Sequence, residues 1–206
     1  MIAIIDYGVG NLRSVQKAFE KVGHNAIVTS NPKEIENAKA VVLPGVGAFA
    51  KCIGNLNEYG LVDVIYKTIK AGKPFLGICL GMQLLFTEGE EFGIHKGLDI
   101  IKGRVVRFPA TSSNNGPLKV PHMGWNNLII KKDAPILSDI RNNPFVYFVH
   151  SYYCVPEDSS VMAAVTDYGL QFTSTIWKEN IYATQFHPEK SQEIGLKILK
   201  RFGELS

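Results

Sequence analysis

The feature that most constrains the fold is an alternation of short apolar runs with helical patterns in the first half of the chain. Four apolar runs predict buried strands: 2–5, 26–28, 40–43 and 75–78. Three stretches between them predict helices: 11–22, a short helix that begins at Asn31-Pro32, and 61–70. Strands separated by helices pair in parallel through right-handed crossovers. We therefore expect an α/β fold, an open and mostly parallel sheet with helices on both faces.

The second half of the chain has a different character. Six β-rich runs separated by turn residues predict antiparallel or mixed sheet: 104–108, 127–130, 145–149, 161–166, 172–177 and 181–186. A helix is expected over 191–202, and the polar segment 111–117, which contains Gly and Pro, is expected to be a mobile loop. No internal repeat divides the 206 residues, so we expect a single domain spanning 1–206.

Composition excludes several classes of function. A net charge of +3 without a cluster of Lys and Arg does not indicate nucleic acid binding. No apolar run reaches the roughly 18 residues that span a bilayer, and the N-terminal run 1–5 is too short for a signal peptide. A cytoplasmic protein is expected. Three cysteines without a Cys-x-x-Cys pair predict neither a disulfide framework nor a zinc site, and no cofactor is expected.

The segment Gly77-Ile78-Cys79-Leu80-Gly81 has the spacing of a nucleophile elbow, with sulfur in place of the serine oxygen. It lies where a predicted strand gives way to a helix, and ligands bind at the carboxyl ends of strands in open α/β sheets. A helix start favours thiolate, and the Leu80 amide would point at an oxyanion. The alternative, a small buried hydrophobe, is the interpretation we adopt for Cys52 and Cys154.

A cysteine nucleophile needs a base, and His187 has the most suitable setting of the five histidines. It follows a β-rich run, and Glu189 lies two residues on, where a carboxylate can hold one imidazole nitrogen. His24 and His95 are expected to be ordinary surface or core residues. The sequence leaves His122 and His150 open.

A second oxyanion donor is suggested by the glycine-rich turn 44–47 (PGVG), directly after the third predicted strand. Its backbone amides, at Val46 or Gly47, could face a developing negative charge. The turn lacks the Gly-Lys-Ser/Thr of a Walker A loop. A plain turn remains the alternative.

Three segments in this order, 44–47 (PGVG), 77–83 (GICLGMQ) and 187–189 (HPE), resemble the signatures of the class I (triad) glutamine amidotransferases. Four further segments resemble one branch of that family, the glutaminase subunits that work with a barrel-shaped cyclase subunit in histidine biosynthesis: 6–12 (DYGVGNL), 121–126 (PHMGWN), 147–152 (YFVHSY) and 185–191 (QFHPEKS). The resemblance spans nearly the whole chain and implies the flavodoxin-like fold of the family.

The resemblance also implies a mechanism. The Cys79 thiolate would attack the side-chain amide of L-glutamine, with the oxyanion held by the amides of Leu80 and the Val46-Gly47 turn. His187, oriented by Glu189, would protonate the leaving ammonia and later activate water. The ammonia would then pass through the cyclase partner to a ribulosyl-aminoimidazole nucleotide, sheltered from water that would protonate it.

Further roles come from the same resemblance. Gln83, Ser151 and Tyr152 are expected to contact glutamine. Residues Asn11, Trp125 and Lys190 lie in segments that face the partner in this family, and a core position is the alternative for Trp125.

Three other functions stay open at this point. A glutaminase subunit of similar build could serve another synthase, such as one that supplies ammonia for amino-sugar tailoring. A cysteine hydrolase of the same build could act on peptides or a small aldehyde, although it would not need Gln83. A regulatory subunit with a decayed site is disfavoured, because Cys79, His187 and Glu189 are all present.

Overall fold

The structure is a computed structural model that describes residues 1–111, 116–141 and 143–206. Its helices are α1 (Leu12–Lys21), α2 (Pro32–Asn37), α3 (Phe49–Glu58), α4 (Val62–Lys70), α5 (Leu80–Leu84) and α6 (Gln192–Glu204). Its strands are β1 (Ile2–Ile5), β2 (Ala26–Thr29), β3 (Ala40–Gly45), β4 (Phe75–Cys79), β5 (Phe86–Gly89), β6 (His95–Lys96), β7 (Ile101–Arg107), β8 (His122–Asn127), β9 (Ile129–Ile130), β10 (Phe145–His150), β11 (Tyr152–Pro156), β12 (Met162–Asp167), β13 (Gln171–Lys178) and β14 (Ile181–Thr184).

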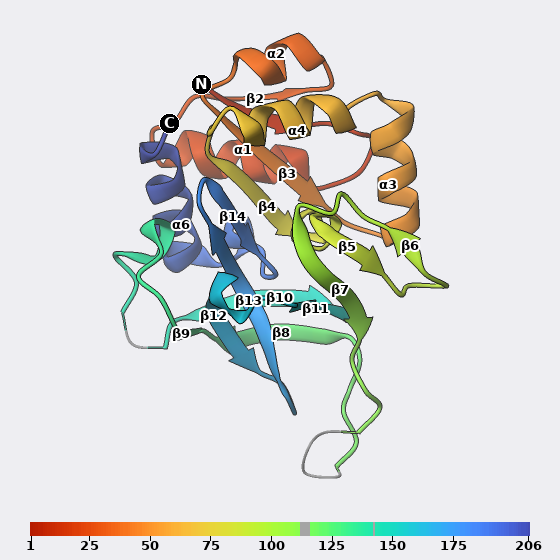
Figure 1. The fold of residues 1–206 in the computed structure, drawn as a ribbon. Helices are drawn as coiled ribbons and strands as arrows, with labels where there is room; N and C mark the ends of the chain where they lie inside the picture. Colours follow the sequence, from red (N-terminus) through yellow and green to blue (C-terminus); the bar gives the residue numbers. More distant parts are fainter. Residues whose placement is uncertain (112–115, 142) are drawn as a thin grey trace.

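A twelve-stranded sheet organises the described chain, with β2-β1-β3-β4-β14 as its parallel half (Figure 1). Helices connect the parallel strands, as the alternation of apolar runs predicted, so the α/β class is confirmed. In this half, Gly45 lies opposite Cys79 and Ile78 opposite Thr184. The carboxyl ends of β3, β4 and β14 therefore meet at one edge of the sheet.

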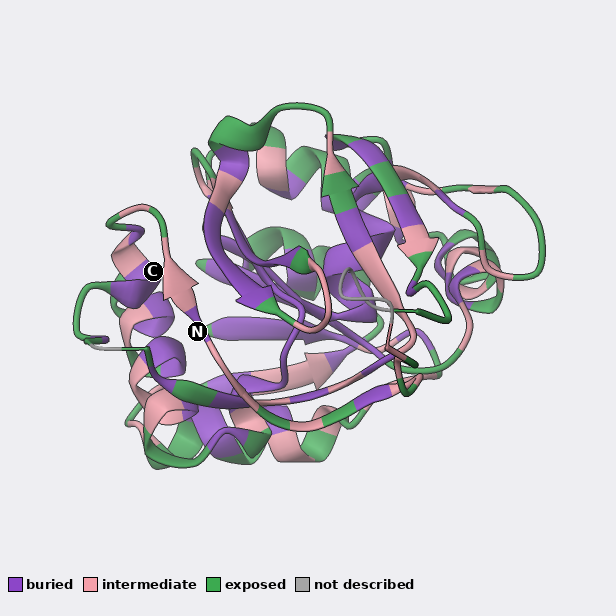
Figure 2. Cartoon of the chain, turned by 90° about the horizontal axis from the view of Figure 1, so that it is seen from below, coloured by how far each residue is buried: buried purple, intermediate pink, exposed green. Residues whose placement is uncertain are grey.

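Both faces of the parallel half are covered by helices. Ile2 and Ile4 pack in one apolar cluster together with residues of α1 and α6. Ala3 and Ile5 point the other way, into a second cluster with residues of α2, α3 and α4. Successive residues of a strand point to opposite faces of the sheet, and here both sets are apolar, as a strand buried on both faces requires. Figure 2 shows these strands buried over most of their length.

The antiparallel half begins where β13 pairs with β14, and it continues through β11 and β7. Strand β12 pairs with β13 and β9, and β8 and β10 form a separate two-stranded sheet. The antiparallel portion expected after residue 103 is thereby confirmed. The predicted run 127–130 is wrong in detail, because the chain changes sheets at the buried Leu128, between β8 and β9.

Five helices or strands were not predicted: α3, β5, β6, β8 and β11. Helix α3 has a glycine at position 54 and asparagines at 55 and 57, residues with low helix propensity. Its buried Phe49, Cys52 and Leu56 still recur on one face. Strand β11 follows β10 after one residue, Ser151, without a Gly or Pro to mark the turn.

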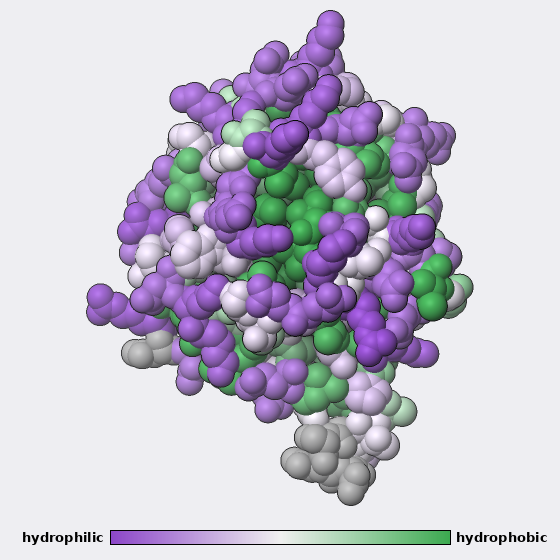
Figure 3. Space-filling model, viewed as in Figure 1, coloured by the Kyte–Doolittle hydropathy of each residue, from purple (hydrophilic) through white to green (hydrophobic). Residues whose placement is uncertain are grey.

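Residues 112–115 of the loop expected over 111–117 lie outside the described residues. Thr111 and Pro117, at the two ends of that loop, form a β-bridge. No helix in the described ranges is long and apolar enough to cross a membrane. On the face shown in Figure 3, polar side chains predominate and an apolar area lies near the centre.

Candidate active site

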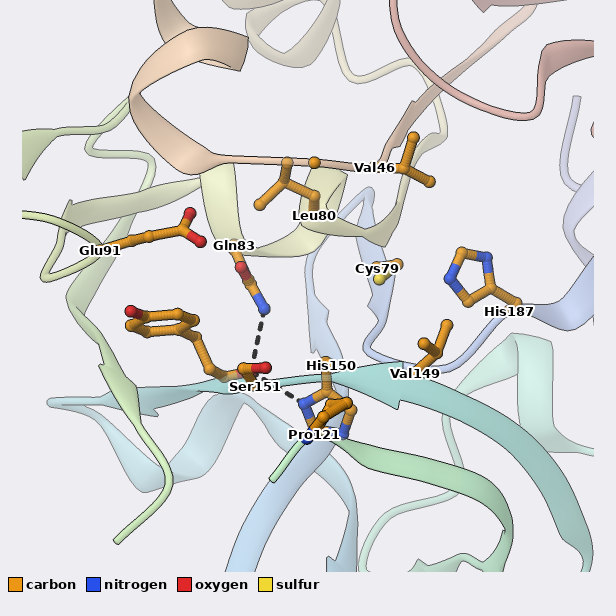
Figure 4. Close-up of a pocket in the computed structure, with 12 residues that line it drawn as sticks. Val46, Cys79, Leu80, Gln83, Glu91, Pro121, Val149, His150, Ser151 and His187 are labelled. Atoms are coloured by element: carbon orange, nitrogen blue, oxygen red, sulfur yellow. Dashed lines mark hydrogen bonds between the residues drawn. The ribbon is translucent and has the colours of Figure 1, made fainter. Parts of the chain in front are cut away.

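A cavity of about 330 Å³ opens where β3 and β4 end (Figure 4). The carboxyl edge of a parallel sheet is the usual ligand site of an open α/β fold, and the volume suits a small metabolite. Twelve residues line the cavity: Val46, Gly47, Cys79, Leu80, Gln83, Glu91, Pro121, Val149, His150, Ser151, Tyr152 and His187.

Cys79 is the last residue of β4 and has a strained backbone, with φ 54° and ψ −109°. Positive φ is uncommon for a residue with a side chain, and it recurs at functional sites held by their surroundings. The neighbouring glycines make this turn possible. A Cβ on Gly81 would lie 1.8 Å from the Leu43 carbonyl oxygen, and one on Gly77 would lie 2.9 Å from the Gly81 oxygen. The elbow thus packs directly against β3.

His187 lies just beyond β14 and shares the cavity with Cys79 (Figure 4). Its Nδ1 is 2.7 Å from Oε1 of Glu189, and the two side chains are 3% and 1% exposed. The backbone here is also fixed, because the His187 amide donates to the Tyr147 carbonyl at 3.0 Å and Ser191 Oγ donates to the His187 carbonyl at 2.7 Å. Among the described residues, Nε2 of His187 has no hydrogen-bond partner fixed by the fold.

The electrostatics of His187 favour its protonated form. Burial lowers the pKa of this imidazole, but the neighbouring Cys79 and the hydrogen bond to Glu189 outweigh burial and raise the pKa to about 10. At neutral pH His187 is therefore an imidazolium held by a buried carboxylate. Such a group can stabilise negative charge on sulfur and can deliver a proton to a leaving group.

Gln83 connects the elbow helix to the opposite wall of the cavity. Its Nε2 donates to the Tyr152 carbonyl at 3.0 Å and to Oε1 of Gln185 at 3.0 Å. Gln185 in turn donates from Nε2 to the Cys79 sulfur at 3.8 Å. Gln185 was not predicted individually, although it lies in the segment 185–191 on which the resemblance rests.

The turn after β3 lies beside the nucleophile, as expected from its position in the sequence. Val46 and Gly47 line the cavity together with Leu80, and Gly47 has φ +96°. The register that places Gly45 opposite Cys79 holds this turn next to the sulfur. Ser151 and Tyr152 line the same cavity from the β10–β11 connection.

Asn11, Trp125 and Lys190 lie outside the cavity. Trp125 is 46% exposed, so it is not a core residue. Its ring lies 6.0 Å from the ring of Tyr147, and Nζ of Lys190 lies 6.0 Å from the same ring. Trp125 and Lys190 therefore share one exposed neighbourhood. Asn11 is exposed at the start of α1.

The model of the glutamine amidotransferase class-I family matches residues 3–204. The chain belongs to this family. It is 59% identical over 206 residues to the imidazole glycerol phosphate synthase subunit HisH of Syntrophotalea carbinolica, with full coverage of both chains. It is 58% identical to the HisH subunit of Geobacter sulfurreducens, over 99% of this chain and 98% of that one.

Two solved structures share the fold of this chain. A crystal structure of a glutamine amidotransferase superposes with a TM-score of 0.76 at 18% identity, covering 100% of this chain and 98% of that one. The structure of PurLQS from Thermotoga maritima gives a TM-score of 0.73 at 18% identity, covering 99% and 95%. At this identity the likeness concerns the fold alone.

Sequence reasoning missed one charged residue of this amidotransferase cavity, Glu91. Its Oε2 accepts a hydrogen bond from the Phe49 amide at 2.7 Å, which ties the β5–β6 connection to the start of α3. Glu91 was missed because neither the β5–β6 hairpin nor α3 was predicted. Glu90 and Glu91 are adjacent, and the sequence alone does not show which of the two carboxylates faces the cavity.

The two histidines left open by the sequence are both buried, and neither is a base for Cys79. Both ring nitrogens of His150 have hydrogen-bond partners, and so do both nitrogens of His122. His150 lines the cavity, whereas His122 lies behind it. Across the described residues, no group of three or more His, Cys, Asp or Glu side chains is arranged to hold a metal ion.

Proposed function

We propose that this chain is the glutaminase subunit of an imidazole glycerol phosphate synthase, hydrolysing L-glutamine to L-glutamate and ammonia. The observation that carries the proposal is that Cys79 and His187 line one cavity, with Glu189 bound to Nδ1 of His187. The full-length identity of 59% and 58% to HisH subunits supports the same assignment.

In the first half-reaction the Cys79 sulfur forms a bond to the side-chain amide carbon of glutamine, and the carbonyl π electrons move to oxygen. The backbone amides of Leu80 and of Val46 or Gly47 would stabilise this oxyanion. His187 then gives its proton to the amide nitrogen, the C–N bond breaks, and ammonia leaves a glutamyl thioester on Cys79. A His187 that is protonated at neutral pH suits this step.

In the second half-reaction His187, now neutral, takes a proton from water. The hydroxide oxygen bonds to the thioester carbon, and collapse of the intermediate expels the Cys79 thiolate and releases glutamate. Glu189 keeps the Nδ1 proton of His187 directed away from the sulfur, so that Nε2 alone handles the transferred proton.

Glutamine would be oriented by the walls of the cavity. Both Nε2 protons of Gln83 are used within the protein, so its Oε1 is the polar atom that it can offer to a ligand. Ser151 and Tyr152 would contact the substrate backbone. Glu91, whose second oxygen is not used by the Phe49 amide, can accept from the α-ammonium group.

A partner subunit follows from the relatives, which are named as subunits of a synthase. We propose that the partner is the barrel-shaped cyclase, forming a heterodimer over the neighbourhood of Asn11, Trp125 and Lys190. Trp125 is exposed, and an exposed tryptophan is typical of an interface anchor. Ammonia would reach the ribulosyl-aminoimidazole nucleotide there, giving imidazole glycerol phosphate and an aminoimidazole carboxamide ribotide. The single domain over 1–206 and the cytoplasmic location stay predictions.

The test is glutamate release from L-glutamine by the chain alone and by the chain with the cyclase subunit and its nucleotide ligand. We expect strong stimulation by the pair and formation of the cyclase products. Stimulation only by an amino-sugar synthase would retain the glutaminase chemistry and overturn the assigned acceptor. No glutamate release under any of these conditions would overturn the proposed function.

A further inference from the structure

A chain of hydrogen bonds runs from strand β8 to the wall of the glutamine cavity through two buried histidines. His122 Nδ1 lies 2.9 Å from His150 Nε2, and His150 Nδ1 lies 2.8 Å from the Tyr152 carbonyl oxygen. At the other end, Nδ2 of Asn126 lies 3.3 Å from His122 Nε2. The mechanism above uses neither histidine, yet the side chains are only 3% and 6% exposed.

The chemistry of the Tyr152 carbonyl determines which atom donates and which accepts in each of these hydrogen bonds. A carbonyl oxygen only accepts, so His150 must carry its proton on Nδ1. In a neutral ring Nε2 of His150 is then an acceptor, so His122 must donate from its own Nδ1. Nε2 of His122 is left as the acceptor for the Asn126 amide. One tautomer, protonated on Nδ1, is therefore imposed on both rings.

The surroundings keep both rings neutral. Burial lowers the pKa of His122 to about 4. Burial likewise lowers the pKa of His150, to about 3, although its hydrogen bond to the Tyr152 carbonyl opposes the shift. Aromatic rings pack around the pair, with Tyr168 stacked on His122 at 4.0 Å and Phe108 at 5.2 Å from His150. Neither ring carries a charge at neutral pH.

The Tyr152 carbonyl is shared by the histidine chain and by the candidate glutamine pocket. It accepts from His150 Nδ1 and also from Nε2 of Gln83, at 3.0 Å. We propose that the His122–His150 pair positions this carbonyl, and through it Gln83, for glutamine binding. The proposal rests on the proposed function, because it assigns a role to the walls of the same cavity.

The expected consequence is a change in KM with little change in kcat. When His150 no longer donates, the Tyr152 carbonyl keeps the hydrogen bond from Gln83 but loses the one from the histidine pair, and we expect the orientation of Gln83 to become less defined. The Cys79 sulfur keeps its contact with Gln185, and His187 keeps its bond to Glu189. A loss confined to substrate binding is therefore predicted.

Two variants that differ by one methylene separate positioning from packing. In His150→Asn the amide nitrogen overlays Nδ1 and can still donate to Tyr152. In His150→Gln the amide group reaches the position of Nε2, where its oxygen can accept from His122 Nδ1, and the donation to Tyr152 is lost. We expect KM for glutamine to rise about fivefold in H150Q, the effect of one lost hydrogen bond, and to stay within about twofold in H150N.

Stability should follow the opposite order: H150N should have the lower free energy of unfolding, because its shorter side chain leaves the larger cavity. The assay uses the complex with the cyclase subunit and its ligand. His24→Gln is the control: His24 does not line the cavity, and its ring is hydrogen-bonded to the Lys200 carbonyl. A KM that rises as much in H150N as in H150Q would overturn the proposal. An inactive wild-type complex would instead overturn the proposed function, and this inference would fall with it.

The tautomers provide a readout that does not depend on activity. Nitrogen-15 NMR of ring-labelled protein distinguishes protonated from unprotonated ring nitrogens. We expect both His122 and His150 to be protonated on Nδ1 and unprotonated on Nε2 at pH 7. A neutral His150 protonated on Nε2 would contradict the proposed hydrogen-bond arrangement directly, since that ring could then not donate to the Tyr152 carbonyl.

Discussion

The two buried histidines, His122 and His150, predict a specific pH dependence of stability. His122 and His150 are neutral in the native state, with pKa values of about 4 and about 3, but they titrate near 6.5 in the unfolded chain. The native pKa values are depressed, so the unfolded state binds more protons below pH 6.5. Stability is therefore fully present above about pH 6.5 and is lost as the pH falls toward 4.

The size of the effect follows from these pKa values. At pH 5 each ring costs the native state about 2 kcal/mol relative to neutral pH, and the pair costs about 4 kcal/mol. His187 acts in the opposite sense. Its native pKa of about 10 is raised, so its stabilisation is complete below pH 6.5 and is lost as the pH rises through 10. Between pH 7 and pH 5, the contribution of His187 to the free energy of unfolding increases by only about 1 kcal/mol.

The perturbation is the double variant His122→Asn, His150→Asn, which removes both titrations and keeps the His187 contribution. Urea unfolding of the isolated chain at pH 7, 6 and 5 gives the free energy of unfolding of each protein. The wild type should lose about 4 kcal/mol more than the double variant between pH 7 and 5, and each single variant should remove about half of that difference. Equal pH slopes in wild type and double variant would refute the buried, neutral pair.

Three further substitutions test the elbow, the triad and the pocket. Gly81→Ala should prevent folding or displace β3, because its Cβ would meet the Leu43 carbonyl; a native circular dichroism spectrum and normal glutaminase activity would contradict this. Glu189→Gln should lower the pKa of His187 and reduce kcat by roughly 10²–10⁴, measured as a pH–rate profile. Glu91→Gln should raise KM for glutamine roughly tenfold or more in steady-state kinetics, while an unchanged KM would exclude contact with the ammonium group.

The parallel half of the fold could be predicted because its signals are local. Buried strands such as β1 and β4 are continuous apolar runs, and α1 and α6 have clear apolar faces, so period and length sufficed. Short strands such as β6, with two residues, gain their stability from pairing with β5 rather than from their own sequence. No window of the sequence contains that information.

The residues of the candidate site likewise fall into two groups, those with a local signal in the sequence and those placed by long-range strand pairing. Cys79 was predictable because its glycines are adjacent in sequence, and Glu189 because it lies two residues from His187. Glu91 and His150 reach the cavity only through the hairpin β5–β6 and the pairing of β10 with β8. Their place in the cavity depends on long-range pairing that the sequence pattern does not carry.

The measurement that tests the central claim most directly is covalent labelling of the chain by a glutamine-analogue affinity label, followed by peptide mapping. Cys79 should carry a single label, and excess glutamine should protect it. Cys52 and Cys154 should stay unmodified, since neither lines the cavity and burial raises the pKa of both thiols, that of Cys52 to about 11. Label on Cys52 or Cys154 with Cys79 untouched would contradict the assignment of Cys79 as the nucleophile.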